Sequence, residues 1–127
     1  MPAGDGFTSA ERQQIDKAIR DAEQVCRYEF SVYVGPVEGD DPRAFARRLH
    51  AALVAPDRSV LLLVDPTSRA LEVVTGEVAR RELEDHEVRL ALVEMQSQLG
   101  VGDFVGAIVR GIGTLAEHAR RPPTLHA

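Results

Sequence analysis

The sequence predicts an α/β fold in which helices cover both faces of a mixed sheet of at least three strands. Residues 60–64 are apolar at every position, which is typical of a strand buried on both sides. A helical segment separates this strand from the one before it, and such a connection favours a right-handed parallel crossover. A short turn joins it to the next strand, which favours antiparallel pairing. The predicted order of elements is therefore α-β-α-β-β-α-α.

The first helix is predicted to begin at Thr8, because Thr8 and Glu11 have the spacing of a capping box. Apolar residues then recur at helical spacing and predict a buried stripe of Ile15, Ile19, Ala22 and Cys26. Residues 28–34 alternate between apolar and polar side chains and include β-branched and aromatic residues, which indicates a strand. The Gly35-Pro36 pair is predicted to end this strand.

The second helix is predicted to begin at Asp41-Pro42, since an aspartate N-cap followed by proline is a common helix start. Its predicted buried stripe consists of Phe45, Leu49, Ala52 and Leu53. Residues 65–69 have the composition of a turn, and residues 70–75 resume a strand. The segment from residue 60 to residue 75 is therefore predicted to be a hairpin with a five-residue loop.

Two longer helices are predicted after a short turn near residues 78–83, with Asp85 and Asp103 as their N-caps. The first should bury Val88, Leu92, Met95 and Leu99. The second should bury Phe104, Ala107, Ile108, Ile112, Leu115 and Ala119. Gly106 and Gly113 lie two helical turns apart, which predicts close packing of the last helix against its neighbour.

Length and composition exclude several classes of protein. The 127 residues fit one domain, predicted to span residues 1–121, with residues 122–127 as a flexible C-terminal tail. The chain has 15 basic and 20 acidic side chains and a net charge of -5, so a general nucleic-acid binder is not expected. No apolar run is long enough to cross a bilayer, and the N-terminus lacks a signal-peptide pattern. We expect a cytoplasmic protein without membrane insertion.

Cysteine, histidine and serine patterns exclude the common catalytic centres. Cys26 is the only cysteine, which rules out an internal disulfide, and its place on an apolar stripe predicts a buried, unreactive thiol. No serine lies in a nucleophile elbow, and the glycines of residues 100–106 do not match a nucleotide fingerprint. Four scattered histidines lack the pairing of a zinc helix and are expected to be exposed on helices: His50, His86, His118 and His126.

One group of polar residues remains as a candidate site. Ligands of open α/β sheets bind beyond the carboxyl ends of parallel strands, which here brings Asp40 and Asp41 toward Asp65, Ser68 and Arg69. Carboxylates on loops suit Ca²⁺ or Mg²⁺, and an arginine suits a phosphate or a carboxylate. The sequence thus predicts a metal site at Asp40, Asp41 and Asp65 and a ligand site at Asp65, Ser68 and Arg69. The alternative is that these residues serve only as an N-cap and turn residues.

The sequence resembles the TPM domain family, whose members include a thylakoid acid phosphatase and many bacterial envelope proteins. The resemblance extends from Phe7 to Ala119 and implies a Rossmann-like three-layer αβα sandwich. The sequence resembles a small actinobacterial branch of unknown function still more closely, and this branch shares residues 30–35 and 73–77. The stretches that carry the wider resemblance are residues 60–64, Arg69 with the strand after it, residues 75–77, residues 83–85, and Gly102-Asp103-Phe104 with Gly106, Gly111 and Leu115.

The polar motifs of the family are only partly kept. Where the family has an Asn-Gly pair before the central strand, this chain has Arg58-Ser59. Where the family has an Asp-Arg pair after that strand, this chain has Ser68-Arg69, and the Gly-x-Gly-x-Glu segment of the family is reduced to Gly76-Glu77. The resemblance therefore implies a noncatalytic binding or regulatory module, with an unidentified protein or small molecule as its partner. The alternative that it implies is a weak acid phosphatase dependent on a divalent metal.

Overall fold

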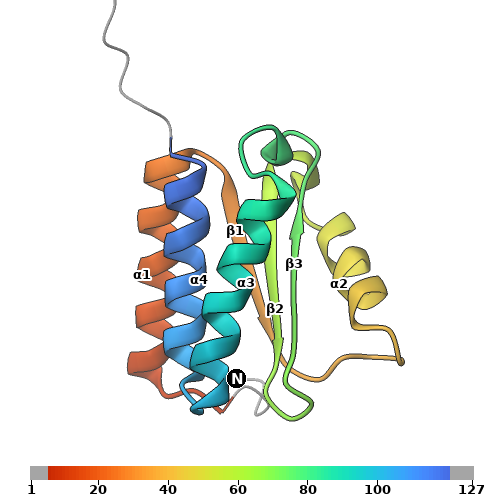
Figure 1. Ribbon diagram of the computed structural model, residues 1–127, viewed down its shortest axis with the longest axis vertical. Helices are drawn as coiled ribbons and strands as arrows, with labels where there is room; N and C mark the ends of the chain where they lie inside the picture. Colours follow the sequence, from red (N-terminus) through yellow and green to blue (C-terminus); the bar gives the residue numbers. More distant parts are fainter. Residues whose placement is uncertain (1–5, 121–127) are drawn as a thin grey trace, which may run out of the picture.

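A computed structural model describes residues 6–120 and shows the predicted αβα sandwich (Figure 1). The helices are α1 (Ser9–Cys26), α2 (Pro42–Ala51), α3 (Asp85–Gly100) and α4 (Phe104–His118), and the strands are β1 (Glu29–Val34), β2 (Ser59–Asp65) and β3 (Ala70–Thr75). Short 3-10 turns at Pro56–Arg58 and Ala79–Arg81 precede β2 and α3. The predicted element order is confirmed, and the predicted tail at residues 122–127 lies outside the described residues.

The sheet has the order β1-β2-β3, so β2 is its central strand. β1 pairs with β2 in parallel, with Phe30 opposite Val60, and β2 pairs with β3 antiparallel, with Val60 opposite Thr75. Every residue of β2 is buried, as its unbroken apolar run predicts. The loop of the hairpin is residues 66–69, one residue shorter than expected, because Asp65 still pairs with Ala70.

Helices cover both faces of this sheet unequally. α1, α4 and α3 form a layer on one face, and α2 covers the other (Figure 1). Alternate residues of β2 enter the two cores: Val60, Leu62 and Val64 face the three-helix layer, and Leu61 and Leu63 face α2. Among residues 6–120, no helix combines the length and the hydropathy needed to span a bilayer.

Helix N-caps follow the predictions with one shift. Thr8 forms the predicted capping box with Glu11, and the side chains of Asp41 and Asp103 cap α2 and α4. The N-cap of α3 is Glu84 and not Asp85, because the Glu87 carboxylate accepts a hydrogen bond from the Glu84 N–H at 3.0 Å. Local capping chemistry thus fixes all four helix starts.

The buried face of α2 differs from the predicted stripe. Ala52 is exposed, while Ala46 and His50 are buried with Phe45. The expected exposure of His50 is wrong, because its Nε2 lies 2.9 Å from the carbonyl oxygen of Ser59, a partner that makes burial of the ring possible. His86 is exposed as expected, with 62% of its side chain accessible, and His126 lies outside the described residues.

Close packing of α4 against α3 involves a different glycine from the two predicted. A Cβ atom on Gly111 would lie 2.4 Å from the Sδ atom of Met95 on α3, so this position has no room for a side chain. A Cβ on Gly113 would meet nothing within 4 Å, and one on Gly106 would meet the side chain of its own N-cap, Asp103. The prediction for Gly106 and Gly113 is therefore wrong, since neither contacts the neighbouring helix there.

Candidate functional site

Asp65, at the end of β2, holds two loops together. Its Oδ2 accepts a hydrogen bond from the N–H of Val37 at 3.1 Å, and its Oδ1 accepts from the N–H groups of Thr67 and Ser68 at 3.0 and 3.3 Å. The residue is only 6% exposed. Burial alone would raise the pKa of Asp65, but these backbone bonds, together with the Ser68 hydroxyl, lower it below the ordinary value. The ionised carboxylate therefore fastens the β1–α2 loop to the β2–β3 turn.

Arg69 and Ser68 also form hydrogen bonds within the fold. The backbone of Arg69 is left-handed, with φ 62°, and its Nη1 donates a hydrogen bond to the carbonyl oxygen of Leu99 at 2.9 Å. That carbonyl belongs to the last turn of α3, where intrahelical donors run out and the helix dipole favours a cation. The Ser68 Oγ accepts a bond from the N–H of Ala70 at 3.3 Å. Arg69 thus joins the hairpin turn to the end of α3.

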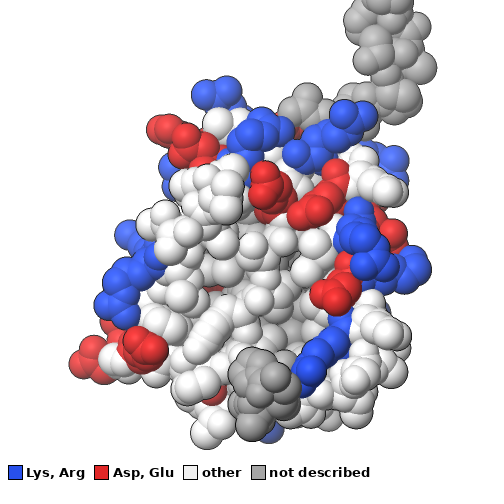
Figure 2. All heavy atoms as spheres, turned by 180° about the vertical axis from the view of Figure 1, so that it is seen from behind, with Lys and Arg blue, Asp and Glu red and all other residues white. Residues whose placement is uncertain are grey.

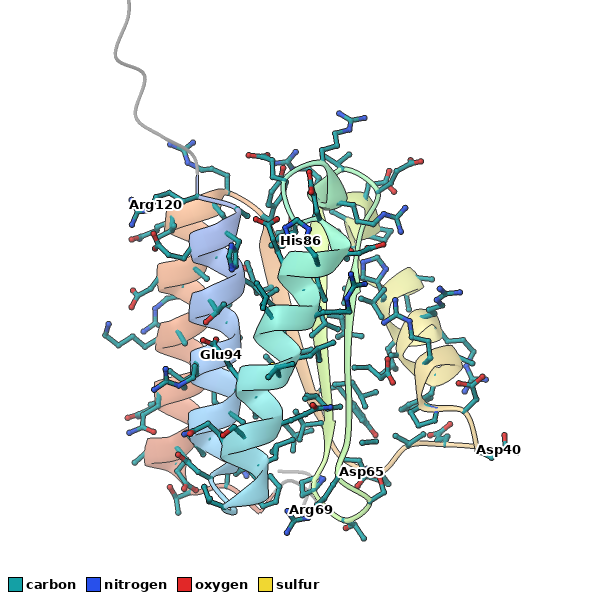
Figure 3. All side chains as sticks on the ribbon, in the orientation of Figure 1. Asp40, Asp65, Arg69, His86, Glu94 and Arg120 are labelled. Atoms are coloured by element: carbon teal, nitrogen blue, oxygen red, sulfur yellow. The ribbon has the colours of Figure 1, made fainter. Side chains whose placement is uncertain are left out.

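The structure separates the predicted metal ligands. Asp41 caps α2 by accepting a hydrogen bond from the N–H of Ala44 at 3.1 Å, and Asp40 lies at the outer end of the β1–α2 loop, pointing away from Asp65 and Arg69 (Figure 3). Within residues 6–120, no group of three or more His, Cys, Asp or Glu side chains could hold a metal ion. Binding of Ca²⁺ or Mg²⁺ here stays a prediction, and it requires the loop to bring Asp40 toward Asp65.

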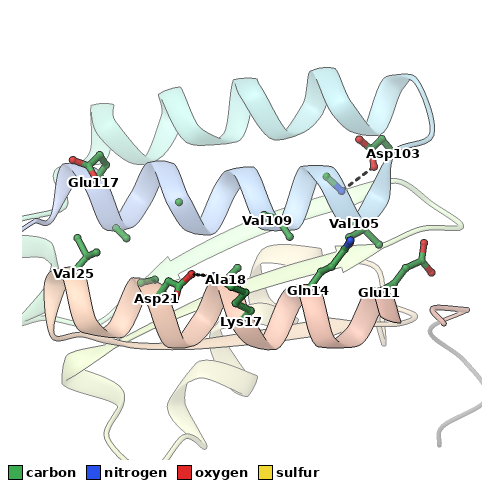
Figure 4. Close-up of a pocket in the computed structure, with 14 residues that line it drawn as sticks. Glu11, Gln14, Lys17, Ala18, Asp21, Val25, Asp103, Val105, Val109 and Glu117 are labelled. Carbon is green, nitrogen blue, oxygen red and sulfur yellow. Dashed lines mark hydrogen bonds and ion pairs between the residues drawn. The ribbon is translucent and has the colours of Figure 1, made fainter. Parts of the chain in front are cut away.

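A groove between α1 and α4 has a volume of about 740 Å³ (Figure 4). Its floor is made of small and apolar residues, and carboxylates and one lysine border it. The floor residues are Ala18, Ala22, Val25, Val105, Gly106, Val109, Gly113 and Ala116, and the bordering residues are Glu11, Gln14, Lys17, Asp21, Asp103 and Glu117. Its size is that of a ligand-binding cleft.

The two helices that form the groove run in the same direction. Glu11 and Asp103 lie at one end of it, near the two helix N-termini, and Val25 and Glu117 lie at the other (Figure 4). Gly106 and Gly113 line the groove, and the open space beside Gly113 is part of the hollow. The sequence predicts internal packing for these two glycines. The lack of a side chain at Gly113 deepens the surface instead, whereas the Asp103 side chain fills the space beside Gly106.

Acidic groups dominate the border of the groove. Lys17 is paired with Asp21 at 2.7 Å, so its charge is balanced locally. Glu117 pairs with Arg120 at 2.8 Å, and the hydrogen bond from Arg120 lowers the pKa of the Glu117 carboxyl. Asp103 accepts hydrogen bonds from the Gly106 N–H at 2.8 Å and from Gln98 at 3.0 Å. Lys17 and Arg120 thus balance two of the four carboxylates, and Glu11 and Asp103 leave the groove with a negative charge.

The opposite side of the molecule offers a different surface. Between α1 and α2, uncharged atoms occupy its centre and charged side chains lie around them (Figure 2). β1 is an edge strand here, but Glu23 of α1 accepts a hydrogen bond from the outward N–H of Phe30 at 3.0 Å. This contact protects half of the edge against pairing with another strand.

Cys26 is fully buried, as predicted. Burial raises the pKa of its thiol, which disfavours the reactive thiolate. Cys26 is the last residue of α1 and packs in the hydrophobic core.

Comparisons with known proteins show the fold and the family. The BA42 protein of the psychrophilic bacterium Bizionia argentinensis has a solved structure that superposes with a TM-score of 0.82 at 21% identity, covering 90% of this chain and 81% of that one. The N-terminal domain of the cg2496 protein of Corynebacterium glutamicum superposes with a TM-score of 0.76 at 15% identity, covering 94% and 82%. At such identities these likenesses establish the fold alone.

Sequence relatives are uncharacterised. An uncharacterized protein of Mycobacterium tuberculosis is 29% identical over 110 residues, which are 87% of this chain and 65% of that protein. The chain therefore spans about two thirds of the length of this relative. An actinobacterial relative of unknown function agrees with the branch that the sequence resembles, while membership of the TPM family stays a prediction. Residues 2–116 match a family model, and the chain belongs to that family, a domain of unknown function (DUF5130).

Proposed function

We propose that this domain is a noncatalytic binding module that holds a protein partner in the α1–α4 groove. The observation that carries the proposal is the outward side of α4, where Gly113 borders a hollow floored by apolar atoms. Glycine within a helix costs about 1 kcal/mol relative to alanine. No atom of the described residues would obstruct a Cβ at Gly113, so the fold does not require this glycine. Close approach of an external molecule to α4 would explain why this position is glycine.

The state of the predicted polar site supports a noncatalytic role. An acid phosphatase needs an activated nucleophile or a metal, together with a cation that can reach the phosphate. Both oxygens of Asp65 accept backbone hydrogen bonds, and Arg69 donates to the end of α3. Using the bonded oxygens of Asp65 or the Nη1 of Arg69 in catalysis would compete with contacts that hold the loops in place. The binding proposal requires no such rearrangement.

A photo-crosslinking experiment tests the proposal. A photoreactive amino acid replaces Val109 in the floor of the groove, and in a control protein it replaces Gln96, which is exposed on α3. Both proteins are irradiated in a mycobacterial host. We expect a discrete adduct from position 109 that is absent from position 96.

A second variant shows whether the adduct depends on the groove. Gly113→Leu adds a side chain whose Cβ meets no atom within 4 Å and which extends into the hollow, and it should abolish the adduct. Equal adducts from positions 109 and 96, or an adduct that survives Gly113→Leu, would contradict the proposal.

A further inference from the structure

We infer that the partner held by the groove is a positively charged amphipathic helix that lies antiparallel to α1 and α4. This inference rests on the proposed function of the groove. It specifies the secondary structure, the charge and the direction of the partner, each from a separate feature.

The walls of the groove favour a helix over an extended peptide. Both walls are helices, whose main-chain N–H and C=O groups are already bonded within α1 and α4. An extended peptide would lose water from its own backbone there and find no main-chain partners. A helix satisfies its backbone internally and presents only side chains, which is how amphipathic helices bind in apolar grooves.

The length of the groove fits a helix of a few turns. From Glu11 to Val25 the groove follows 14 residue steps of α1, which at 1.5 Å per residue is about 21 Å. The floor is apolar, so the partner needs apolar side chains at i, i+3, i+4 and i+7. Gly113, beside which no atom lies within 4 Å of a Cβ position, lets the partner backbone come near α4.

The border of the groove selects the charge of the partner. Glu11, Asp21, Asp103 and Glu117 line it, and Lys17 is the only cation among the lining residues. A partner with lysine or arginine beside its apolar stripe would place cations against these carboxylates. A partner with glutamate or aspartate there would meet like charges at short range.

The direction follows from the two parallel helices. The C-termini of α1 and α4 lie at the same end of the groove, where their dipoles add negative charge. The last turn of α1 has no basic residue before its C-cap Arg27, and the last turn of α4 holds His118. An antiparallel partner would place its positive N-terminus at this end, near Val25 and Glu117. A parallel partner would place a third negative C-terminus there.

Three synthetic peptides of about 15 residues test the inference by NMR titration of the full chain. The first is a helix with leucine and alanine on one face and lysine and arginine beside them. The second replaces each basic residue by glutamate, and the third scrambles the first so that its apolar residues no longer share a face. We expect only the first to shift the amide signals of Ala18, Val25, Val109 and Gly113.

Two variants and a spin label complete the test. Gly113→Leu should weaken binding of the first peptide at least tenfold, while the matched Gln96→Leu, which adds the same side chain on exposed α3, should leave it unchanged. A spin label on the N-terminus of the peptide should broaden the signals of Val25 and Glu117 more than those of Glu11 and Asp103.

The outcomes separate the inference from the proposed function. Equal binding of the basic and acidic peptides would overturn the charge assignment, and broadening at Glu11 would overturn the direction. If no peptide binds while the crosslink at position 109 persists, the partner is not a helix of this kind, although the groove still binds a protein. If the crosslink also fails, the proposed function itself is wrong.

Discussion

Replacing Asp65 by asparagine should destabilise the fold, because it removes the charge-assisted hydrogen bond from the Val37 N–H. Asparagine keeps one carbonyl oxygen, which can still accept from the N–H groups of Thr67 and Ser68. Its amide nitrogen then faces the N–H of Val37, a donor opposite a donor, where Asp65 Oδ2 now accepts at 3.1 Å. Losing a hydrogen bond to a charged acceptor and leaving a part-buried N–H unpaired costs about 2 kcal/mol.

The assay is urea unfolding at neutral pH, with Asp41→Asn as the matched control. Asp41 accepts a backbone N–H at an exposed helix start, where asparagine caps nearly as well as aspartate, so this variant should lie within about 0.5 kcal/mol of the wild type. The dependence of the unfolding free energy on urea should have the same slope in all three proteins, because the surface exposed on unfolding does not change.

The pH dependence of the stability difference between the wild type and Asp65→Asn is a separate check on the contacts of Asp65. The pKa of Asp65 is lower in the folded protein than its unfolded value of about 3.9. Its contribution to stability is therefore complete above that unfolded value and is lost as the pH falls through the folded value. The gap between wild type and Asp65→Asn should be constant near neutrality and should narrow below about pH 4. A gap under about 0.5 kcal/mol at neutral pH, or one that widens in acid, would refute the reasoning.

Three further outcomes follow from the structure. Gly113→Ala should raise the unfolding free energy measured in urea titrations by about 0.5–1 kcal/mol. Gly111→Ala should lower it, because the added Cβ would lie 2.4 Å from Met95 Sδ. A change of the same sign in both variants would contradict this. Cys26 should resist a thiol reagent until denaturant is added, and rapid labelling of the native protein would show that the thiol is accessible. Purified protein should not hydrolyse an aryl phosphate; turnover that needs Ca²⁺ or Mg²⁺ and is lost in Asp65→Asn would establish the phosphatase alternative.

Local chemistry made most of the fold predictable. The capping box at Thr8, the caps at Asp41 and Asp103 and the apolar run of β2 each depend on residues close together in the chain, and the structure has all of them. The cap predicted at Asp85 is formed by its neighbour Glu84 instead. His50 was misplaced because its burial depends on the carbonyl of Ser59, which only the folded chain brings near. The two glycines were misassigned for the same reason, since the position of α3 relative to α4 decides which glycine meets Met95.

The groove could not be found from sequence spacing. Its walls come from residues 11–25 and 103–117, which are far apart in the chain and become neighbours only when α1 and α4 pack. Each helix by itself shows an ordinary amphipathic pattern. The one signal in the sequence was the pair of glycines in the last helix. Such glycines indicate that another group approaches the helix closely, but they do not tell whether that group is a neighbouring helix or an external molecule.

The antiparallel hairpin explains why backbone groups of the chain itself contact Asp65 at the predicted sheet-edge site. In open α/β sheets a crevice forms where the connections from neighbouring parallel strands leave in opposite directions. Here only β1 and β2 are parallel, and β2 returns at once into β3, so the turn lies directly over the end of β2. Backbone N–H groups from that turn and from the β1–α2 loop occupy the Asp65 carboxylate, the group a ligand or metal would use. These hydrogen bonds at the sheet edge are one reason why we propose the hollow between α1 and α4 as the place for a partner.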